Sequence, residues 1–229
     1  PYYPRIKKIS EDKYLLFYQN ATHGSDIYVA ILDGLGKVNS TKMIYSRYPA
    51  SGDTRYFANC DACVLKNGDV LTVASFRAKT NYANKPAQNG LVIRRSRDKG
   101  VTWEPEQIVY YGTTWEPYIY QDPESEEIQI YWTNTNIYPI EGGETNGSSG
   151  VAIIRSLDNG YTWTSDLSKT YSGQIVSQTA TQFLNGRQFY SDQMPCAIKL
   201  HNGKIALALE TRNTTAGNYK YTISFSSDN

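Results

Sequence analysis

Two glutamates in this chain of 229 residues stand where their carboxyl groups could act as a pair. Glu116 lies in the run "WEPYIY", and Glu210 ends the run "KIALALE". Retaining hydrolysis of a glycoside needs two carboxyl groups roughly 5–5.5 Å apart, one as the nucleophile and one as the acid and then the base. These groups must come from different elements that converge on one pocket, so the chemistry requires two neighbouring structural units.

The sequence around each glutamate predicts how its carboxyl group is presented. Pro117 biases Glu116 towards extended backbone and so predicts the start of a strand. Alternation in "KIALALE" places Ala206, Ala208 and Glu210 on one face of a strand. We expect this face to be packed, and burial among alanines would raise the pKa of the Glu210 carboxyl group, as an acid catalyst requires.

The overall composition excludes several other classes of function. The chain has 23 basic and 22 acidic residues, and its net charge of +1 argues against binding to nucleic acid or to an acidic membrane surface. No apolar run approaches the roughly 20 residues of a membrane helix. Three cysteines and two histidines are too few for a convincing zinc site. We therefore expect neither a metal nor an organic cofactor.

Pairs of alternating runs joined by tight turns form the framework that positions these groups. The segments "ACVLKNGDVLTVASF" (62–76) and "CAIKLHNGKIALALE" (196–210) each centre on Asn-Gly, which is the strongest short signal for a β-hairpin. "PRIKKISEDKYLLFYQ" and "PYIYQDPESEEIQIYWT" fit the same template with weaker turns. No stretch has helical periodicity over three turns.

One polar turn occurs twice, as "SRDKGVTW" (96–103) and "SLDNGYTW" (156–163), and "SFSSDN" places Ser226 and Asp228 at the start of a third copy. In such a turn the aspartate can accept backbone N–H bonds, the glycine supplies a positive φ and the tryptophan packs between sheets. We interpret these residues as structural and not catalytic. They are Ser96, Asp98, Gly100, Trp103, Ser156, Asp158, Gly160 and Trp163.

Four-stranded antiparallel units that recur roughly every 60 residues are typical of a β-propeller. The units are predicted at approximately 1–50, 57–112, 113–172 and 190–229, within a single domain. The fourth unit is incomplete, so we expect the chain to be truncated at its C-terminal end.

The repeated turn is identified as the Asp-box, or BNR repeat, and the chain resembles the sialidase superfamily of six-bladed propellers. That resemblance implies a six-bladed β-propeller of which about four blades are present. Asp-boxes mark an architecture and do not name a reaction. Functional residues are therefore expected at the rim of the central channel, where alignment of the hairpins places Arg5, Asp61, Glu116 and Asp192.

Four segments at that rim are similar to motifs of glycoside hydrolase family 93: "YPRI" (3–6), "NCDACVLKNGDVL" (59–71), "WEPYIY" (115–120) and "DQMPCAIKLHNGKIALALE" (192–210). That family comprises exo-acting α-L-arabinanases, which release arabinobiose from linear arabinan with retention. The resemblance implies that Glu116 and Glu210 are the catalytic pair. Their spacing in the chain departs from the family pattern through the insertion "SGQIVSQTATQFLNGRQ".

Further residues are candidates for contacts with a sugar. Arg5, Asp61 and Asp192 could form charged hydrogen bonds to hydroxyl groups, and Trp115 could provide a stacking platform. Arg77 and Arg212 lie at the ends of second strands and are additional candidates. A polysaccharide substrate implies an extracellular or periplasmic protein, and we expect a monomer.

Two alternatives remain open at the level of sequence. A sialidase needs an arginine cluster and an activated tyrosine, and usually begins with a Phe/Tyr-Arg-Ile-Pro motif, whereas this chain has Tyr-Pro-Arg-Ile. The loop "RAKTNYANKPAQNG" (77–90) lacks the acidic residue that such an enzyme carries, although Asp26 could substitute. The other alternative is a non-catalytic propeller that binds glycans or proteins. The separation of Glu116 and Glu210 distinguishes these classes, because paired-carboxylate hydrolysis fails beyond roughly 10 Å.

Overall fold

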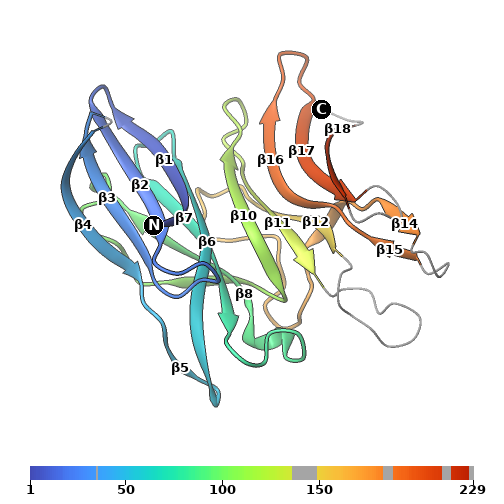
Figure 1. Ribbon diagram of the computed structural model, residues 1–229. Helices are drawn as coiled ribbons and strands as arrows, with labels where there is room; N and C mark the ends of the chain where they lie inside the picture. The colour runs from blue at the N-terminus through green and yellow to red at the C-terminus, as the bar shows by residue number, and fades with distance from the viewer. Residues whose placement is uncertain (35, 136–148, 183–187, 213–217, 227–229) are drawn as a thin grey trace.

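The computed structural model describes the chain except for residues 35, 136–148, 183–187, 213–217 and 227–229. Within the described residues the fold consists of antiparallel strands and one short 3-10 helix, η1 (Pro86–Gln88). No helix in this part of the chain is long and apolar enough to cross a membrane. The strands form four large sheets, which we number blades 1 to 4 in chain order (Figure 1).

The strands of each blade follow one another across the sheet in chain order. Blade 1 consists of β1 (Tyr2–Ser10), β2 (Lys13–Gln19), β3 (Ile27–Asp33) and β4 (Lys37–Tyr45). Blade 2 consists of β5 (Tyr48–Ala50), β6 (Asp53–Val64), β7 (Val70–Ala78), β8 (Gly90–Ser96) and β9 (Gln107–Tyr111). Blade 3 consists of β10 (Thr114–Gln121), β11 (Ile128–Thr135), β12 (Ser149–Ser156) and β13 (Gln174–Ser177). Blade 4 consists of β16 (Gln193–Lys199), β17 (Ile205–Arg212) and β18 (Tyr219–Phe225), and a small separate sheet pairs β14 (Ala180–Gln182) with β15 (Gln188–Tyr190).

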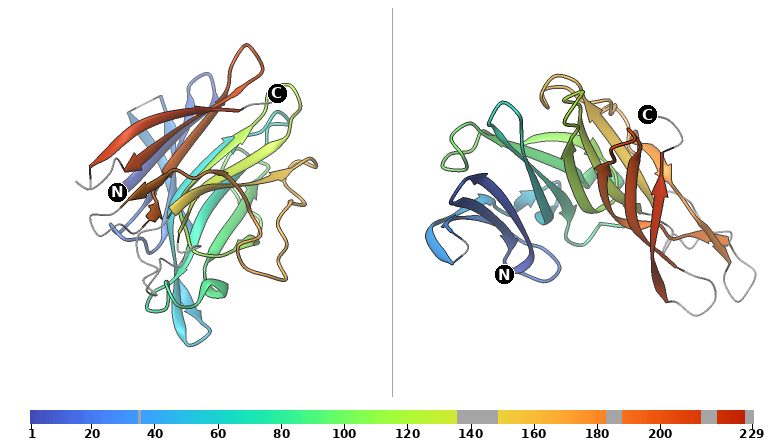
Figure 2. Two further views of the ribbon diagram at one scale, coloured as in Figure 1. Left: turned by 90° about the vertical axis from the view of Figure 1, so that its right-hand side faces the viewer. Right: turned by 90° about the horizontal axis from the view of Figure 1, so that it is seen from above.

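The blades stand next to one another with their inner strands in contact. β1 contacts β6, β6 contacts β10, and β10 contacts β16. Figure 1 and the right-hand view of Figure 2 show blade 1, in blue, at one end of the molecule and blade 4, in orange and red, at the other. The predicted all-β propeller architecture is confirmed, with four sheets arranged as propeller blades.

The boundary between blades 1 and 2 lies earlier than expected. Residues up to 50 were assigned to the first unit, but β5 pairs with β6 and belongs to blade 2. Ser51 and Gly52, which join these strands, both have positive φ values, of 52° and 76°. A two-residue hairpin turn requires this backbone conformation. The Ser-Gly pair therefore joins β5 to β6 in one hairpin and places the start of blade 2 at β5.

Both Asn-Gly turns join the first two long strands of a blade, as predicted. Asn67-Gly68 connects β6 to β7, and Asn202-Gly203 connects β16 to β17. The two glycines have φ values of +91° and +83°. This left-handed conformation is accessible to glycine at little cost.

Every inner strand carries the same β-bulge. In β1, β6, β10 and β16 the pairing with the second strand is interrupted by one extra residue. The first residue of each bulge has a positive φ: Tyr3 (49°), Asn59 (52°), Glu116 (45°) and Met194 (56°). A bulge of this kind bends the strand and changes the direction of its side chains. The same backbone conformation therefore sets the direction of one side chain in each blade.

The two copies of the repeated turn form the same hydrogen bonds. In the first copy Ser96 Oγ donates to Asp98 Oδ1 at 2.8 Å and accepts the Gly100 N–H at 2.7 Å, while Trp103 Nε1 donates to the Gly100 carbonyl at 3.1 Å. The second copy repeats these bonds at 2.7, 2.8 and 3.2 Å with Ser156, Asp158, Gly160 and Trp163. Hydrogen bonds, first the one from the Thr102 hydroxyl, lower the pKa of Asp98 to about 2. Of the expected third copy, Asp228 lies outside the described residues.

A separate hydrophobic cluster lies at each interface between neighbouring blades. Leu15 and Phe17 of blade 1 pack with Phe57 of blade 2, and Leu71 of blade 2 packs with Trp132 of blade 3. A smaller cluster joins blades 3 and 4. The core is thus divided among the blade interfaces, as expected for sheets that pack face to face.

Candidate active site

The bulge in β10 determines how Glu116 is presented. We expected extended backbone at this residue because Pro117 follows it, but its φ is +45°. The reason is that Glu116 and Pro117 together oppose a single residue of β11, between the pairs Trp115↔Thr133 and Tyr118↔Tyr131. Residues other than glycine rarely hold this conformation, and such strain is concentrated at functional sites.

Glu116 is half-buried, and one described side chain donates a hydrogen bond to its carboxyl group. Its Oε2 accepts a hydrogen bond from Thr133 Oγ1 at 3.0 Å. Burial raises the pKa of Glu116, and the negative charge of Glu210 raises it further. The Thr133 hydroxyl and the positive charges of Arg77 and Arg5 act in the opposite direction, yet the pKa remains above its ordinary value. The group can therefore hold a proton at a pH where an exposed glutamate is ionised.

A continuous set of contacts links Glu116 in blade 3 to Glu210 in blade 4. Thr133 Oγ1, which donates to Glu116, also accepts the N–H of Met194 at 2.8 Å. The preceding residue, Gln193, donates from Nε2 to Glu210 Oε2 at 3.2 Å and is paired with Glu210 across the sheet. Both carboxyl groups thus belong to the same end of the propeller, on adjacent blades.

The environment of Glu210 differs from the sequence expectation. We expected a packed alanine face, but Ala208 is exposed and Ala206 is only half-buried, as is Glu210 itself. The reason is that the face of blade 4 that carries Ala208 is not covered by another sheet in the described structure. Phe17, Val73 and Tyr131 occupy the same position as Ala208 on the second strands of blades 1 to 3, and all three are buried. The expected packing of Glu210 on a buried alanine face is therefore not found.

Glu210 occupies a position that recurs in every blade. The residue before each bulge is paired with Gln19, Ser75, Thr133 or Glu210 on the second strand. Gln19 accepts the N–H of the bulge residue Asn59 in the next blade at 2.8 Å, and Thr133 does the same for Met194. A polar side chain at this position therefore faces the bulge of the following blade. For this reason Thr133 of β11 contacts both Glu116 in blade 3 and Met194 in blade 4.

Arg77 and Trp115 form a stacked pair beside Glu116. The Arg77 guanidinium lies 3.6 Å from the centre of the Trp115 ring, and its Nε donates to the carbonyl of Thr114 at 3.2 Å. Its Nη2 donates to Asn59 Oδ1 at 2.7 Å, and the side chain is buried. We expected Arg77 to contact substrate, but its side chain is buried and donates to the backbone carbonyl of Thr114, two residues before Glu116. One face of Trp115 is covered by this guanidinium, and the residue as a whole is half-buried.

Asp61, another predicted substrate contact, is completely buried. Its Oδ1 forms an ion pair with Lys7 Nζ at 2.9 Å, and its Oδ2 accepts the N–H of Ile119 at 3.2 Å. Because Lys7 belongs to blade 1 and Ile119 to blade 3, Asp61 ties three blades together. The prediction of a sugar contact here is wrong, since no surface of the residue is accessible.

Asp192 is also buried and fully engaged. Its Oδ2 accepts bonds from Ser177 Oγ at 2.6 Å and from the N–H and hydroxyl of Thr179 at 3.0 Å each, and its Oδ1 accepts a bond from the Thr211 hydroxyl. This carboxylate joins the chain after β13 to β17. Its predicted role in substrate binding is therefore replaced by a structural one.

The two remaining arginines differ in their surroundings. Arg5 is exposed on β1, and its Nη1 donates only to the neighbouring carbonyl of Pro4, at 3.2 Å, among the described contacts. Its positive charge lowers the pKa of Glu116. Arg212 is half-buried at the end of β17, where its guanidinium lies 5.0 Å from the centre of the Tyr219 ring. Arg5 is the predicted cation best placed to meet a ligand.

Thr133 and Gln193 are site residues that the sequence reading did not identify. Each lies one strand away from a predicted glutamate, and only the register of β11 and β16 brings them into contact with it. The local signal that could have found the site is the Xaa-Pro pair shared by three bulges, Tyr3-Pro4, Glu116-Pro117 and Met194-Pro195. Among the described residues no group of three or more His, Cys, Asp or Glu side chains could hold a metal ion.

Comparison with known proteins supports the fold and leaves the family open. No family model and no curated protein matches the chain. A protein of unknown function from Dyadobacter fermentans DSM 18053 is similar in structure, with a TM-score of 0.65 and 16% identity over 99% of this chain and 65% of the other. An endo-1,5-alpha-L-arabinanase from Thermotoga petrophila RKU-1 has a TM-score of 0.64 and 14% identity over 97% of this chain and 56% of its own. The NanB sialidase from Streptococcus pneumoniae has a TM-score of 0.62 and 11% identity over 98% of this chain and 51% of its own.

This chain therefore spans between half and two thirds of the length of the structures that it resembles. At such low identity the similarity establishes the fold alone. The similar structures include propeller glycoside hydrolases and sialidases, and they do not single out glycoside hydrolase family 93. The chain thus has the fold of the propeller glycosidases and sialidases.

Proposed function

We propose that this protein is an exo-acting, retaining glycoside hydrolase that releases arabinobiose-type units from α-1,5-L-arabinan. The observation that carries the proposal is the pair of carboxyl groups on adjacent blades. Both residues are half-buried, burial raises the pKa of Glu116, and Thr133, Met194 and Gln193 link the two. A carboxyl group with a raised pKa beside a second carboxyl group is suited to the role of the acid in one reaction.

In the first step Glu116 is the acid and Glu210 the nucleophile. The raised pKa favours the protonated form of Glu116, and the proton is transferred to the glycosidic oxygen as the bond to the leaving sugar breaks. A Glu210 oxygen attacks the anomeric carbon at the same time and forms a glycosyl ester. In the second step Glu116, now ionised, removes a proton from water, and the resulting attack on the ester releases the sugar with its original configuration.

Other residues of the site hold these groups in place. Thr133 fixes Oε2 of Glu116 and leaves Oε1 for the proton transfer. Arg77 restrains the backbone at Thr114 and stacks on Trp115, which fixes the direction from which the glutamate projects. Arg5, exposed on an inner strand, can donate charged hydrogen bonds to sugar hydroxyls. A polysaccharide substrate would place the protein in an extracellular or periplasmic compartment, acting as a monomer.

The proposal is tested by incubating the chain with linear α-1,5-arabinan and analysing the size of the products. We expect arabinobiose as the first product, and a loss of at least about 10³-fold in kcat for Glu116→Gln and for Glu210→Gln with arabino-oligosaccharide binding retained. Sialyl-lactose is the matched control substrate, and release of sialic acid from it would favour the sialidase alternative. Oligosaccharide binding without turnover by the unmodified chain would instead indicate a non-catalytic propeller.

A further inference from the structure

Met194 is an exposed apolar residue within the set of contacts that links the two glutamates. It is the first residue of the bulge in β16, and its exposed fraction is 39%. Its N–H donates to Thr133 Oγ1 at 2.8 Å, and the same hydroxyl group donates to Glu116 Oε2 at 3.0 Å. The mechanism proposed above gives the Met194 side chain no role.

Strand register relates Met194 to the second glutamate. Glu116 is the first bulge residue of β10, and Thr133, which bonds to it, lies opposite the residue before that bulge. Glu210 likewise lies opposite the residue before the bulge of β16, whose first residue is Met194. The two bulge residues have similar backbone conformations, with φ values of 45° and 56°. The equivalence of the bulges therefore places Met194 next to Glu210 as Glu116 is next to Thr133.

The exposure of Met194 is a property of the bulge position. Tyr3 is the bulge residue of blade 1, and its exposed fraction is 40% although blade 2 packs against blade 1. Asn59 is the bulge residue of blade 2, and it is buried with its Oδ1 accepting a hydrogen bond from Arg77. The bulge position is thus open to solvent in blade 1, which has a following blade in the described structure, as well as in blade 4.

An exposed thioether beside two carboxyl groups is suited to contact an apolar part of a ligand. A methionine side chain donates no hydrogen bond and adapts to irregular surfaces. Sugar rings carry C–H groups on their faces and hydroxyl groups at their edges, and sites for small molecules combine apolar side chains with a few polar groups. Glu116 and Glu210 supply the polar groups here, and Met194 supplies the apolar surface.

We propose that Met194 is a sugar-binding residue whose side chain packs on the C–H face of the arabinose ring that Glu210 attacks. This inference rests on the proposed function, because it names a contact of the same substrate. Met194 takes no part in bond making or proton transfer. It excludes water from one face of the ring and holds that ring against the two carboxyl groups.

The chain contains two methionines, which allows the proposal to be tested by oxidation of the unmodified protein. Met43 lies on β4, at the edge of blade 1 opposite to β1, and its exposed fraction of 44% is similar to that of Met194. Hydrogen peroxide converts an accessible thioether to the sulfoxide. We expect saturating arabinobiose to slow the oxidation of Met194 at least about fivefold and to leave that of Met43 unchanged, as measured by peptide mass spectrometry.

Calorimetric titration with arabinobiose separates failure of this inference from failure of the proposed function. Saturable binding, with equal oxidation of Met194 in the presence and absence of the disaccharide, would overturn the inference alone. Absence of binding together with no hydrolysis of arabinan would overturn both.

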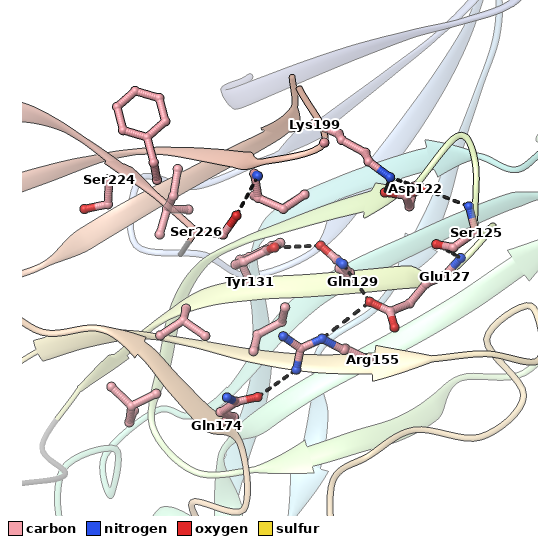
Figure 3. Close-up of a pocket in the computed structure, with 17 residues that line it drawn as sticks. Asp122, Ser125, Glu127, Gln129, Tyr131, Arg155, Gln174, Lys199, Ser224 and Ser226 are labelled. Carbon is pink, nitrogen blue, oxygen red and sulfur yellow. Dashed lines mark hydrogen bonds and ion pairs between the residues drawn. The ribbon is translucent and has the colours of Figure 1, made fainter. Parts of the chain in front are cut away.

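A cavity of about 840 Å³ between blades 3 and 4 provides a control for the location of the sugar. Tyr131 and Arg155 line this cavity, whereas Met194 and the two glutamates do not (Figure 3). We expect Arg155→Met to bind arabinobiose as tightly as the unmodified chain does. Loss of binding in this variant, with Met194 unprotected in the unmodified chain, would assign the sugar to the cavity and contradict the proposal.

Substitution of Met194 gives an independent measure of the contact. Met194→Ala should lower kcat/KM for arabinan about tenfold, mainly through a higher KM, because an apolar contact with the bound ring is removed. Met194→Leu keeps an apolar side chain of similar volume and should lose less. Met43→Ala is the matched control and should retain the kcat/KM of the unmodified chain. A loss in Met194→Ala that is carried by kcat alone would show that Met194 acts on Glu116 through Thr133 and would contradict a sugar contact.

Discussion

At the scale of single residues, the proposed chemistry depends on the unequal environments of two glutamates. Burial and the charge of Glu210 raise the pKa of Glu116, while the Thr133 hydroxyl stabilises its ionised form. A hydrogen bond to a carboxylate lowers the pKa because the bond is stronger in the charged state. Thr133 therefore limits how far burial can raise the pKa of the acid.

This balance predicts the effect of Thr133→Val on the pH profile. Loss of the hydroxyl removes a bond to the ionised carboxylate, so the pKa of Glu116 rises and the alkaline limb of kcat/KM moves to higher pH by about 0.7 unit, equivalent to about 1 kcal/mol. Thr133→Ser keeps the hydroxyl and should leave the limb in place. Profiles on arabinan from pH 4 to 9 compare the two, and a limb shifted equally in both variants would show that the hydroxyl is not responsible.

Glu116→Gln should also change stability in a pH-dependent way. The folded-state pKa of Glu116 is raised, so the stability that its protonated form contributes is present below the unfolded pKa of about 4.3 and is lost as the pH rises through the folded pKa. We expect the glutamine variant to be more stable than the unmodified chain at pH 7 and nearly equal to it at pH 4. Urea unfolding at both pH values measures this, and a difference independent of pH would contradict it.

At the scale of elements, the bulge of each inner strand sets the direction of its side chains, and the repeated turn packs one blade against the preceding one. The Asn-Gly hairpins and the repeated turn were predictable because each depends on residues close together in sequence. The bulge was not predicted, because it breaks the alternation on which strand prediction relies and depends on pairing with another strand. The same applies to Asp61 and Asp192, whose partners Lys7 and Thr179 lie on other elements, so their burial could not be inferred locally.

The close contact of the repeated turn with the preceding blade predicts unequal effects of two matched glycine substitutions. Gly100 and Gly68 both have a φ of +91°, but a Cβ at Gly100 would lie 2.8 Å from Leu15, whereas no atom lies within 4 Å of one at Gly68. Backbone strain alone should cost about 1–2 kcal/mol in Gly68→Ala. The additional overlap in Gly100→Ala should add about 1–3 kcal/mol. Thermal unfolding of both variants measures the difference, and equal Tm values would show that the turn does not press on blade 1.

At the scale of the whole molecule, stability depends on contacts between blades. Each blade interface has its own apolar cluster, and Asp61 adds a buried polar link from blade 2 to blades 1 and 3. The Lys66–Glu126 pair also joins two blades, at 2.6 Å, but both side chains are exposed. Exposed ion pairs contribute little because water and salt screen them.

These two ion pairs predict a contrast between buried and exposed links. Asp61→Ala should lower the free energy of unfolding by about 3 kcal/mol, because it removes the partner of Lys7 and leaves the N–H of Ile119 without an acceptor. Glu126→Ala should change it by less than about 0.5 kcal/mol. Urea unfolding at pH 7 compares the variants, and similar losses in both would show that burial of Asp61 does not matter.

The most direct test of the central claim is to identify the residue that becomes covalently attached to sugar. Glu116→Gln is incubated with an activated arabinobioside whose leaving group needs no protonation, so that the ester can form but lacks the base for its hydrolysis. The account predicts a mass increase of one arabinobiosyl unit, mapped by peptide mass spectrometry to Glu210 and absent in the Glu116→Gln, Glu210→Gln double variant. A label on another residue, or inversion of configuration by the unmodified chain, would contradict the assignment of Glu116 and Glu210 as the catalytic pair.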